Sequence, residues 1–162
     1  MSKPLTYLVI HCTATPEGRE VTAEEIRRWH TSPPPKGRGW KQVGYSDLIH
    51  LDGIIENLVP YNNDDIVDVW EITNGASGVN SVSRHVVYAG GVSADDVKKA
   101  RDTRTWLQEL AMITYVKETI ARHPNIKVAG HNQFNSGKAC PSFDVPSWCR
   151  KIGIPEKNIY KG

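Results

Sequence analysis

The feature that most constrains the fold is the run Tyr7–Cys12, whose residues are aromatic, β-branched or otherwise apolar, with the exception of His11. A strand of this composition, without polar alternation, is typical of the centre of a sheet that is covered on both faces. A chain of 162 residues is long enough to build one layered domain around such a strand. We therefore expect a single α/β domain that spans residues 1–162.

Three helices are expected around this sheet. Thr22 and Glu25 form a capping box, which predicts a short helix over about 22–31. Asp144 and Pro146 predict the start of a last short helix, because Asp caps a helix and Pro suits its first turn. A longer helix is predicted over about 103–123, where apolar residues recur at helical spacing. These residues, with Trp106 expected as a core anchor, are Trp106, Leu107, Leu110, Ile113, Val116 and Ile120.

Further strands are expected between these helices. Asp52-Gly53 is a two-residue turn signal between the β-rich segments 45–51 and 54–58, so it predicts a hairpin. Residues 84–91 and 127–130 also have the composition of strands. Strands and helices are therefore mixed along the chain, as in an α/β sheet with helices on its faces.

The balance of charge argues against two classes of partner. The chain has 20 Lys and Arg against 18 Asp and Glu, a net charge of +2, which is too small to indicate nucleic acid or an anionic membrane.

The apolar run 5–10 is shorter than the ~7–15 residues of a signal-peptide core, and no apolar stretch approaches the ~20 residues that span a bilayer. We expect synthesis in the cytoplasm without a signal peptide and without membrane insertion. Three cysteines, an odd number, do not indicate a disulfide framework.

One set of residues has the chemistry of a metal site. His11 lies near the end of the first strand, His131 follows a late strand, and Cys140 comes one short loop later. Two imidazoles and a thiolate with an open fourth position suit catalytic zinc, because Zn²⁺ takes nitrogen and sulfur ligands tetrahedrally. The two histidines are far apart in sequence and there is no local CxxC or HExxH motif. From the residues alone, two hydrogen-bonded structural histidines and a buried thiol remain the alternative.

Seven short segments resemble, in order, successive motifs of one family. They are residues 9–15, 25–30, 43–45, 52–53, 90–91, 130–131 and 138–144. The last, KACPSFD, is the most specific. On these motifs the chain is similar to the zinc-dependent N-acetylmuramoyl-L-alanine amidases, which include amidase-type phage lysozymes and peptidoglycan recognition proteins.

The resemblance implies a central mixed β-sheet flanked by about three helices, with a groove over a zinc ion. It implies zinc ligands at His11, His131 and Cys140 and catalytic roles for Tyr45 and Lys138. The implied activity is hydrolysis of the amide between N-acetylmuramic acid and L-alanine in peptidoglycan. Zinc lowers the pKa of bound water to about 7, and a lysine and a phenol can stabilise the oxyanion that forms. Which group protonates the leaving amine is left open.

Two departures from the family pattern fall where substrate is expected to bind. Relatives commonly have a histidine and an aromatic residue after Tyr45, whereas this chain has Ser46 and Asp47. Alternation along a strand places Asp47 on the face of Tyr45, so we expect it to add a carboxylate to the groove. Relatives often carry a histidine where this chain has Gly75, shortly before Asn80, which we assign to substrate binding.

Residues 59–74 resemble an insertion relative to the smaller phage enzymes. The segment carries Trp70 and four acidic residues, Asp64, Asp65, Asp68 and Glu71. We expect it to wall one side of the groove, with its carboxylates opposite a basic residue of the stem peptide and Trp70 against the peptide. A solvated loop is the alternative. Trp40 is a second candidate for stacking on the substrate, and the histidines at positions 30, 50, 85 and 123 are expected to be mainly structural.

Two other functions remain compatible with these residues. A non-catalytic peptidoglycan-binding module is the first, although binding-only relatives tend to lack the cysteine that Cys140 provides here. A cytosolic muropeptide-recycling amidase is the second, in place of a lytic enzyme that reaches the wall after holin-type release. In each case we expect a peptidoglycan or muropeptide ligand, no nucleic acid, and a monomer.

Overall fold

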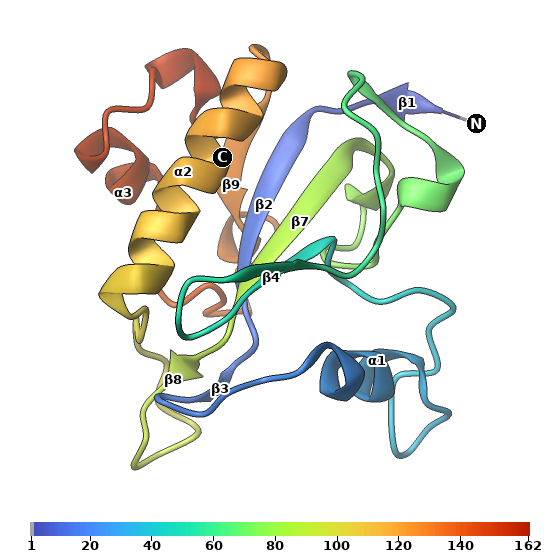
Figure 1. Ribbon diagram of the computed structural model, residues 1–162, viewed down its shortest axis with the longest axis vertical. Coiled ribbons are helices and arrows are strands. Elements are labelled where there is room, and N and C mark those ends of the chain that lie inside the picture. The colour runs from blue at the N-terminus through green and yellow to red at the C-terminus, as the bar shows by residue number, and fades with distance from the viewer. Residues whose placement is uncertain (1) are drawn as a thin grey trace.

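The run expected to form a central strand is an interior strand of the main sheet in the computed structural model, which describes residues 2–162 (Figure 1). This strand, β2 (Tyr7–Cys12), lies between β7 (Ser83–Tyr88) and β9 (Lys127–Gly130). With β4 (Asp47–Ile49) and β5 (Ile55–Asn57), the sheet has the order β5-β4-β7-β2-β9. Four strands are parallel and β5 is antiparallel to β4, so the expected mixed sheet is confirmed.

The remaining elements are short strand pairs and helices. Two two-stranded sheets pair β1 (Lys3–Pro4) with β6 (Ile66–Val67) and β3 (Thr15–Pro16) with β8 (Gly91–Val92). The α-helices are α1 (Ala23–Thr31), α2 (Trp106–Arg122) and α3 (Val145–Lys151). Short 3-10 helices cover Val69–Glu71, Asn80–Val82, His131–Gln133 and Glu156–Asn158. Within residues 2–162, no helix is both long and apolar enough to cross a membrane.

Local signals decide where the helices begin. The capping box of α1 is present, since the Thr22 side chain accepts from the backbone of Glu25 and the Glu25 side chain accepts from the backbone of Thr22. Thr105 caps α2 in the same way, and Asp144 caps α3. The hairpin predicted at residues 52–53 joins β4 to β5, and Gly53 adopts the positive φ that its turn requires.

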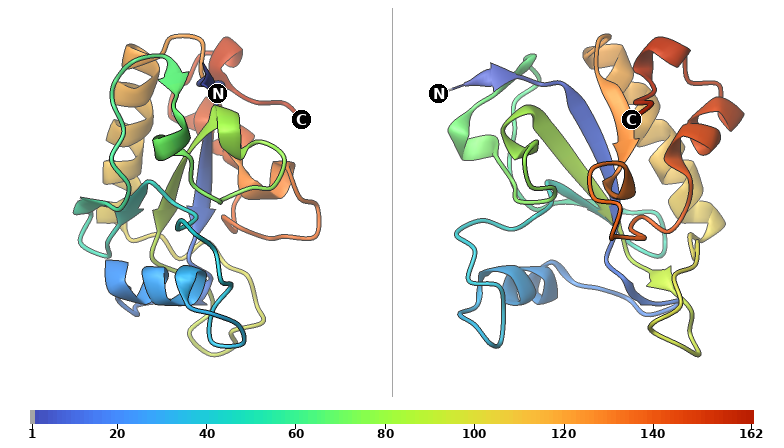
Figure 2. Two further views of the ribbon diagram at one scale, coloured as in Figure 1. Left: turned by 90° about the vertical axis from the view of Figure 1, so that its right-hand side faces the viewer. Right: turned by 180° about the vertical axis from the view of Figure 1, so that it is seen from behind.

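The two faces of the sheet are covered differently. In Figure 2, α2 runs along one face, where Leu8 and Ile10 join a core cluster with residues of α2 and α3. Burial of each such side chain contributes about 1.5–3 kcal/mol to stability. Side chains alternate along a strand, so Val9 and His11 point to the opposite face. A second, smaller cluster on that face packs against α1.

The long helix α2 confirms the predicted element, but the predicted buried face is wrong in its first turns. Trp106, Leu107 and Leu110 are 72%, 42% and 46% exposed, whereas Gln108 is fully buried. The Gln108 amide donates to the carbonyls of Ile49 and Ala89, and these bonds hold the polar side of the first turn against the sheet. The hydrophobic spacing therefore predicts where the helix lies in the sequence but not which of its faces is buried.

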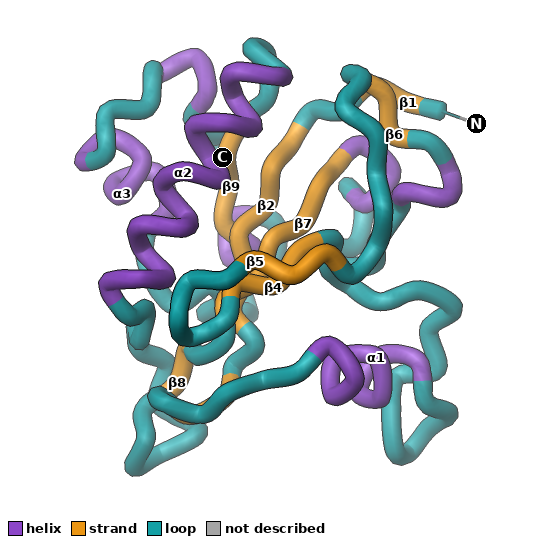
Figure 3. Tube along the Cα trace, in the orientation of Figure 1, coloured by secondary structure: helices purple, strands orange, loops and turns teal. Residues whose placement is uncertain are grey.

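The parallel register brings the ends of β2 and β9 together. Gly130, the last residue of β9, pairs with Ile10 of β2, so His11 in β2 and His131, directly after β9, lie side by side. Ligand sites of open α/β sheets lie at this carboxyl edge of the strands. Figure 3 shows that long loops continue from this edge.

Candidate metal centre and active-site groove

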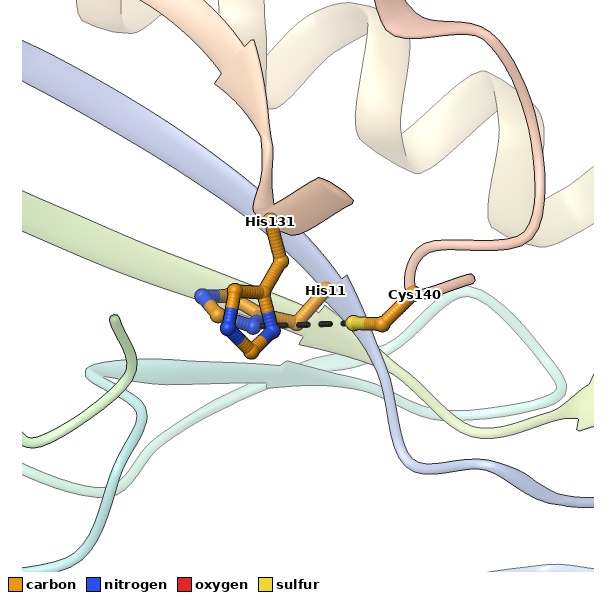
Figure 4. A group of neighbouring side chains, drawn as sticks. All are labelled: His11, His131 and Cys140. Atoms are coloured by element: carbon orange, nitrogen blue, oxygen red, sulfur yellow. Dashed lines mark hydrogen bonds between the residues drawn. The ribbon is translucent and has the colours of Figure 1, made fainter. Parts of the chain in front are cut away.

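His11, His131 and Cys140 meet at the carboxyl ends of β2 and β9 (Figure 4). One ligand atom from each residue lies within 4.8 Å of the other two. Nδ1 of His11 is 3.7 Å from Sγ of Cys140, and the two histidine rings have centroids 4.7 Å apart. These three side chains form a possible metal-binding group.

The distance between His11 and Cys140 in this group fits a tetrahedral zinc site. Zinc–nitrogen and zinc–sulfur distances of about 2.0–2.1 and 2.3 Å place a nitrogen and a sulfur ligand about 3.6 Å apart, close to the 3.7 Å between His11 and Cys140. Burial, and then the neighbouring His85 and His131, hold the pKa of His11 well below its ordinary value. Burial and the charge of Lys138 also lower the pKa of His131. Both imidazoles are therefore neutral at pH 7 and keep a lone pair for a metal.

Cys140 is held by β2, the strand that carries His11. The backbone N–H of Cys12 donates to Sγ of Cys140 at 3.2 Å, and such a donor stabilises a thiolate. The Cys12 side chain is 3% exposed and joins the core cluster on the α2 side of the sheet. Cys12 thus supports Cys140 through its backbone.

Tyr45 and Lys138 both border the groove that reaches His131. The ring of Tyr45 lies beside His11, with ring centroids 5.0 Å apart. Burial raises the pKa of the Tyr45 phenol far above its ordinary value, so its O–H stays protonated and can donate at neutral pH. Lys138 is exposed in the loop before Cys140. Two donors therefore lie beside the metal-binding group.

The groove itself has a volume of about 640 Å³ and a cationic lining. Arg38 and Lys41 border it on one side, and Lys138 borders it near the metal-binding group. Arg38 lies over the ring of Trp40, 5.1 Å from the ring centroid, in a cation–π contact. Among the described residues that line this groove, none is Asp or Glu. The groove is therefore complementary to an anionic ligand.

The chain matches the model of the N-acetylmuramoyl-L-alanine amidases over residues 1–143. The chain belongs to this family. The endolysin of Klebsiella phage KP32 is 31% identical over 146 residues, which cover 90% of this chain and 86% of that protein. The solved structure of the endolysin from Thermus scotoductus bacteriophage Ph2119 has a TM-score of 0.66 and 25% identity, and the match covers 98% of this chain and 87% of that one. The amidase LysC from Clostridium intestinale has a TM-score of 0.68 and 21% identity, with coverage of 94% and 87%.

These similarities confirm the predicted family, the fold and the amidase activity. The chain is thus an enzyme of the class expected from its motifs. Among the described residues of this amidase, His11, His131 and Cys140 form a group that suits a metal.

The expectation that Asp47 adds a carboxylate to the groove is wrong. Asp47 is 3% exposed, and its carboxylate accepts hydrogen bonds from Tyr61, Tyr115 and Asn57 at 2.6, 2.6 and 3.0 Å. Tyr115 belongs to α2, so this carboxylate lies on the face opposite the groove. The alternation argument fails because β4 begins only at Asp47, and Tyr45 lies outside the strand.

The acidic residues and Trp70 of the segment 59–74 do not wall the groove of this amidase either, and of this segment Asn74 alone lines it. Its strand β6 pairs with β1, at the amino end of β2, whereas the metal-binding group lies at the carboxyl end. Trp70 is 54% exposed and does not line the groove. The carboxylates serve local structure: Asp65 bonds to His123 at 2.7 Å, Asp68 accepts from Ser2, and Glu71 accepts from Asn62.

Most of the residues that do line the groove come from loops that sequence patterns describe poorly. The proline-rich loop after α1 supplies Arg38 and Trp40, and the glycine-rich stretch before β7 supplies Asn80. The available sequence signal is Trp40, an aromatic residue close to the basic residues Arg38 and Lys41. Two histidines expected to be structural also reach the site: His30 lines the groove, and His85 contacts His11.

Proposed function

We propose that this amidase is a zinc-dependent, endolysin-type enzyme that cuts the bond between N-acetylmuramic acid and L-alanine in peptidoglycan. His11, His131 and Cys140 are the proposed zinc ligands. The observation that carries the proposal is that their ligand atoms converge within 4.8 Å beside a groove that Tyr45 and Lys138 also border. The endolysin relative and the family match support the same reaction.

The proposed division of labour follows from the environment of each side chain. When bound, zinc supplies Lewis-acid chemistry that polarises the scissile carbonyl and makes water a nucleophile at neutral pH. Tyr45 keeps its proton because burial raises its pKa, so it acts as a hydrogen-bond donor to the developing oxyanion rather than as a base. Lys138 is exposed and carries a full positive charge that stabilises the same oxygen.

The charge of the groove indicates which part of peptidoglycan it holds. Stem peptides carry free carboxylates, and Arg38, Lys41 and Lys138 place three cations along the lining. We propose that these cations bind carboxylates of the stem peptide. This proposal replaces the expectation that carboxylates of the segment 59–74 lie opposite a basic residue of the stem peptide.

Neutralising the groove is expected to weaken substrate binding and leave the chemistry unchanged. Arg38→Gln and Lys41→Gln should each raise KM for stem peptides with free carboxylates by up to about fivefold, since an exposed ion pair contributes about 0.2–1 kcal/mol. The kcat should stay the same, because these contacts are made equally in the ground and transition states. Lys36→Gln is the matched control, since Lys36 is an exposed cation of the same loop outside the groove. An equal rise in KM for carboxyl-amidated peptides would contradict the charge argument.

The activity itself is tested on purified muropeptides of defined structure. We expect a new L-alanine amino terminus and a free lactyl carboxylate in equal amounts, detected by mass spectrometry. Binding without a new amine would favour a peptidoglycan-binding module. Intact sacculi should be cut as readily as soluble muropeptides if the enzyme is lytic, whereas activity on soluble muropeptides alone would favour a recycling role.

We further propose that the single domain of residues 1–162 acts as a monomer. An endolysin role implies that it is made in the cytoplasm and reaches the cell wall after a holin-type lesion opens the membrane. Lysis of permeabilised cells, together with no lysis of intact cells under external addition or internal expression, would support this route. Lysis of intact cells during expression of the chain alone would contradict it.

A further inference from the structure

His85 lies in β7, and its ring contacts the ring of His11 in the metal-binding group. Its Nδ1 is 2.9 Å from Nε2 of His11, while the other ring nitrogen of His11, Nδ1, faces Cys140. Both rings are buried, at 1% exposure for His11 and 0% for His85. His85 neither belongs to the ligand group nor lines the groove, so the proposed reaction makes no direct use of it.

Asn80 extends this contact into a chain of hydrogen bonds. Nε2 of His85 lies 3.0 Å from Oδ1 of Asn80, and the backbone N–H of Ala76 donates to the same oxygen at 2.8 Å. A backbone N–H can only donate, so the Asn80 atom that it meets is the carbonyl oxygen and not the amide nitrogen. That oxygen can only accept, and Nε2 of His85 therefore carries a hydrogen.

The tautomer of His85 in turn determines that of His11. A neutral imidazole with its hydrogen on Nε2 is an acceptor at Nδ1. Nδ1 of His85 therefore accepts from Nε2–H of His11, and this leaves the lone pair of His11 on Nδ1, toward Cys140. The chain that starts at the Ala76 amide thus has one direction and ends at a metal ligand.

Gly75 provides the space for this arrangement. A Cβ atom at Gly75 would lie 2.5 Å from Nδ1 and 2.6 Å from Cγ of His85, and 2.7 Å from the carbonyl oxygen of Gly44. Any side chain at this position would therefore displace the His85 ring. The absence of a side chain at Gly75 therefore leaves the space that the imidazole of His85 occupies.

We propose that His85 is a positioning residue, which holds His11 in the tautomer and orientation that present Nδ1 to the metal. Metal-binding histidines generally donate their second N–H to an acceptor, and loss of that acceptor costs about 10–100-fold in metal affinity. This inference rests on the proposed zinc site. Its test therefore measures zinc affinity, and not only turnover.

The decisive pair of variants is His85→Phe and His85→Asn. Phenylalanine keeps a ring in the cavity without an acceptor, so His85→Phe should raise the Kd for zinc about 10–100-fold in a chelator competition. Asparagine places an oxygen near the position of Nδ1, so His85→Asn should recover part of this loss. The absorption spectrum of the cobalt-substituted protein should also change in His85→Phe, since the orientation of His11 alters the ligand field.

Controls separate a positioning role from a structural one. His123 is equally buried but lies at the end of α2 beside Asp65, so His123→Phe should lower stability and leave the Kd for zinc unchanged. If His85→Phe does not fold, Asn80→Leu removes the acceptor that sets the His85 tautomer and should still raise the Kd. Wild-type affinity and cobalt spectrum in His85→Phe, or in Asn80→Leu where it is needed, would overturn the inference. Failure of the unmodified chain to bind zinc would instead overturn the proposed zinc site.

Discussion

Treatment with a chelator is expected to abolish amide hydrolysis, and one equivalent of zinc per chain is expected to restore it. The reason is that His11, His131 and Cys140 bring two neutral imidazoles and a thiol to the geometry of a tetrahedral site. Cys140→Ser should weaken zinc binding by more than about 100-fold, the upper end of the loss caused by outer-shell changes, because a hydroxyl is a poor zinc ligand beside a thiolate. Metal analysis and equilibrium competition measure both effects.

Cys149 provides the matched control for this substitution. It is a fully buried cysteine of α3 that joins the core and not the metal-binding group. Cys149→Ser should lower stability while the protein still binds one equivalent of zinc. An active, freshly purified preparation that contains no zinc would contradict the proposed cofactor.

Turnover is expected to fall about 10²–10³-fold in both Tyr45→Phe and Lys138→Ala, the usual cost of removing one oxyanion donor. The zinc content should remain at one equivalent, because neither side chain belongs to the ligand group. The loss should appear in kcat and kcat/KM together, since the contact is made in the transition state. Steady-state kinetics on a defined muropeptide, with zinc measured in the same samples, tests both variants.

Tyr160 and Lys36 lie outside the groove and serve as controls for these variants. Tyr160 stacks on Phe134 at a ring distance of 4.9 Å and does not line the groove, so Tyr160→Phe should keep wild-type turnover. Lys36→Ala should do the same. Wild-type kcat in Tyr45→Phe or in Lys138→Ala would remove that residue from the proposed machinery.

Much of the fold follows from short-range signals. The apolar run Tyr7–Cys12 is an interior strand of the sheet, the capping residues Thr22 and Asp144 mark the starts of α1 and α3, and the turn at residues 52–53 joins β4 to β5. These signals work because a cap, a turn or an apolar run acts through neighbours within a few residues.

The expectations that failed concern which way an element faces and what it packs against. Strand alternation extended to Tyr45 predicts Asp47 in the groove, although β4 begins only at Asp47. Helical spacing predicts Trp106 in the core, although Gln108 bonds to the sheet and the first residues of α2 are exposed. The resemblance predicts the acidic residues beside the substrate, although β6 pairs with β1 at the far end of the sheet.

The sequence by itself determined the family, the central strand and the residue types of the candidate metal site. Only the tertiary structure decided which loops border the groove and that His85 lies against His11. The physical reason is the parallel register between strands that are far apart in the chain: Val9 pairs with His85 and Ile10 with Gly130. No local pattern encodes that register, because it depends on how whole strands pack in the finished sheet.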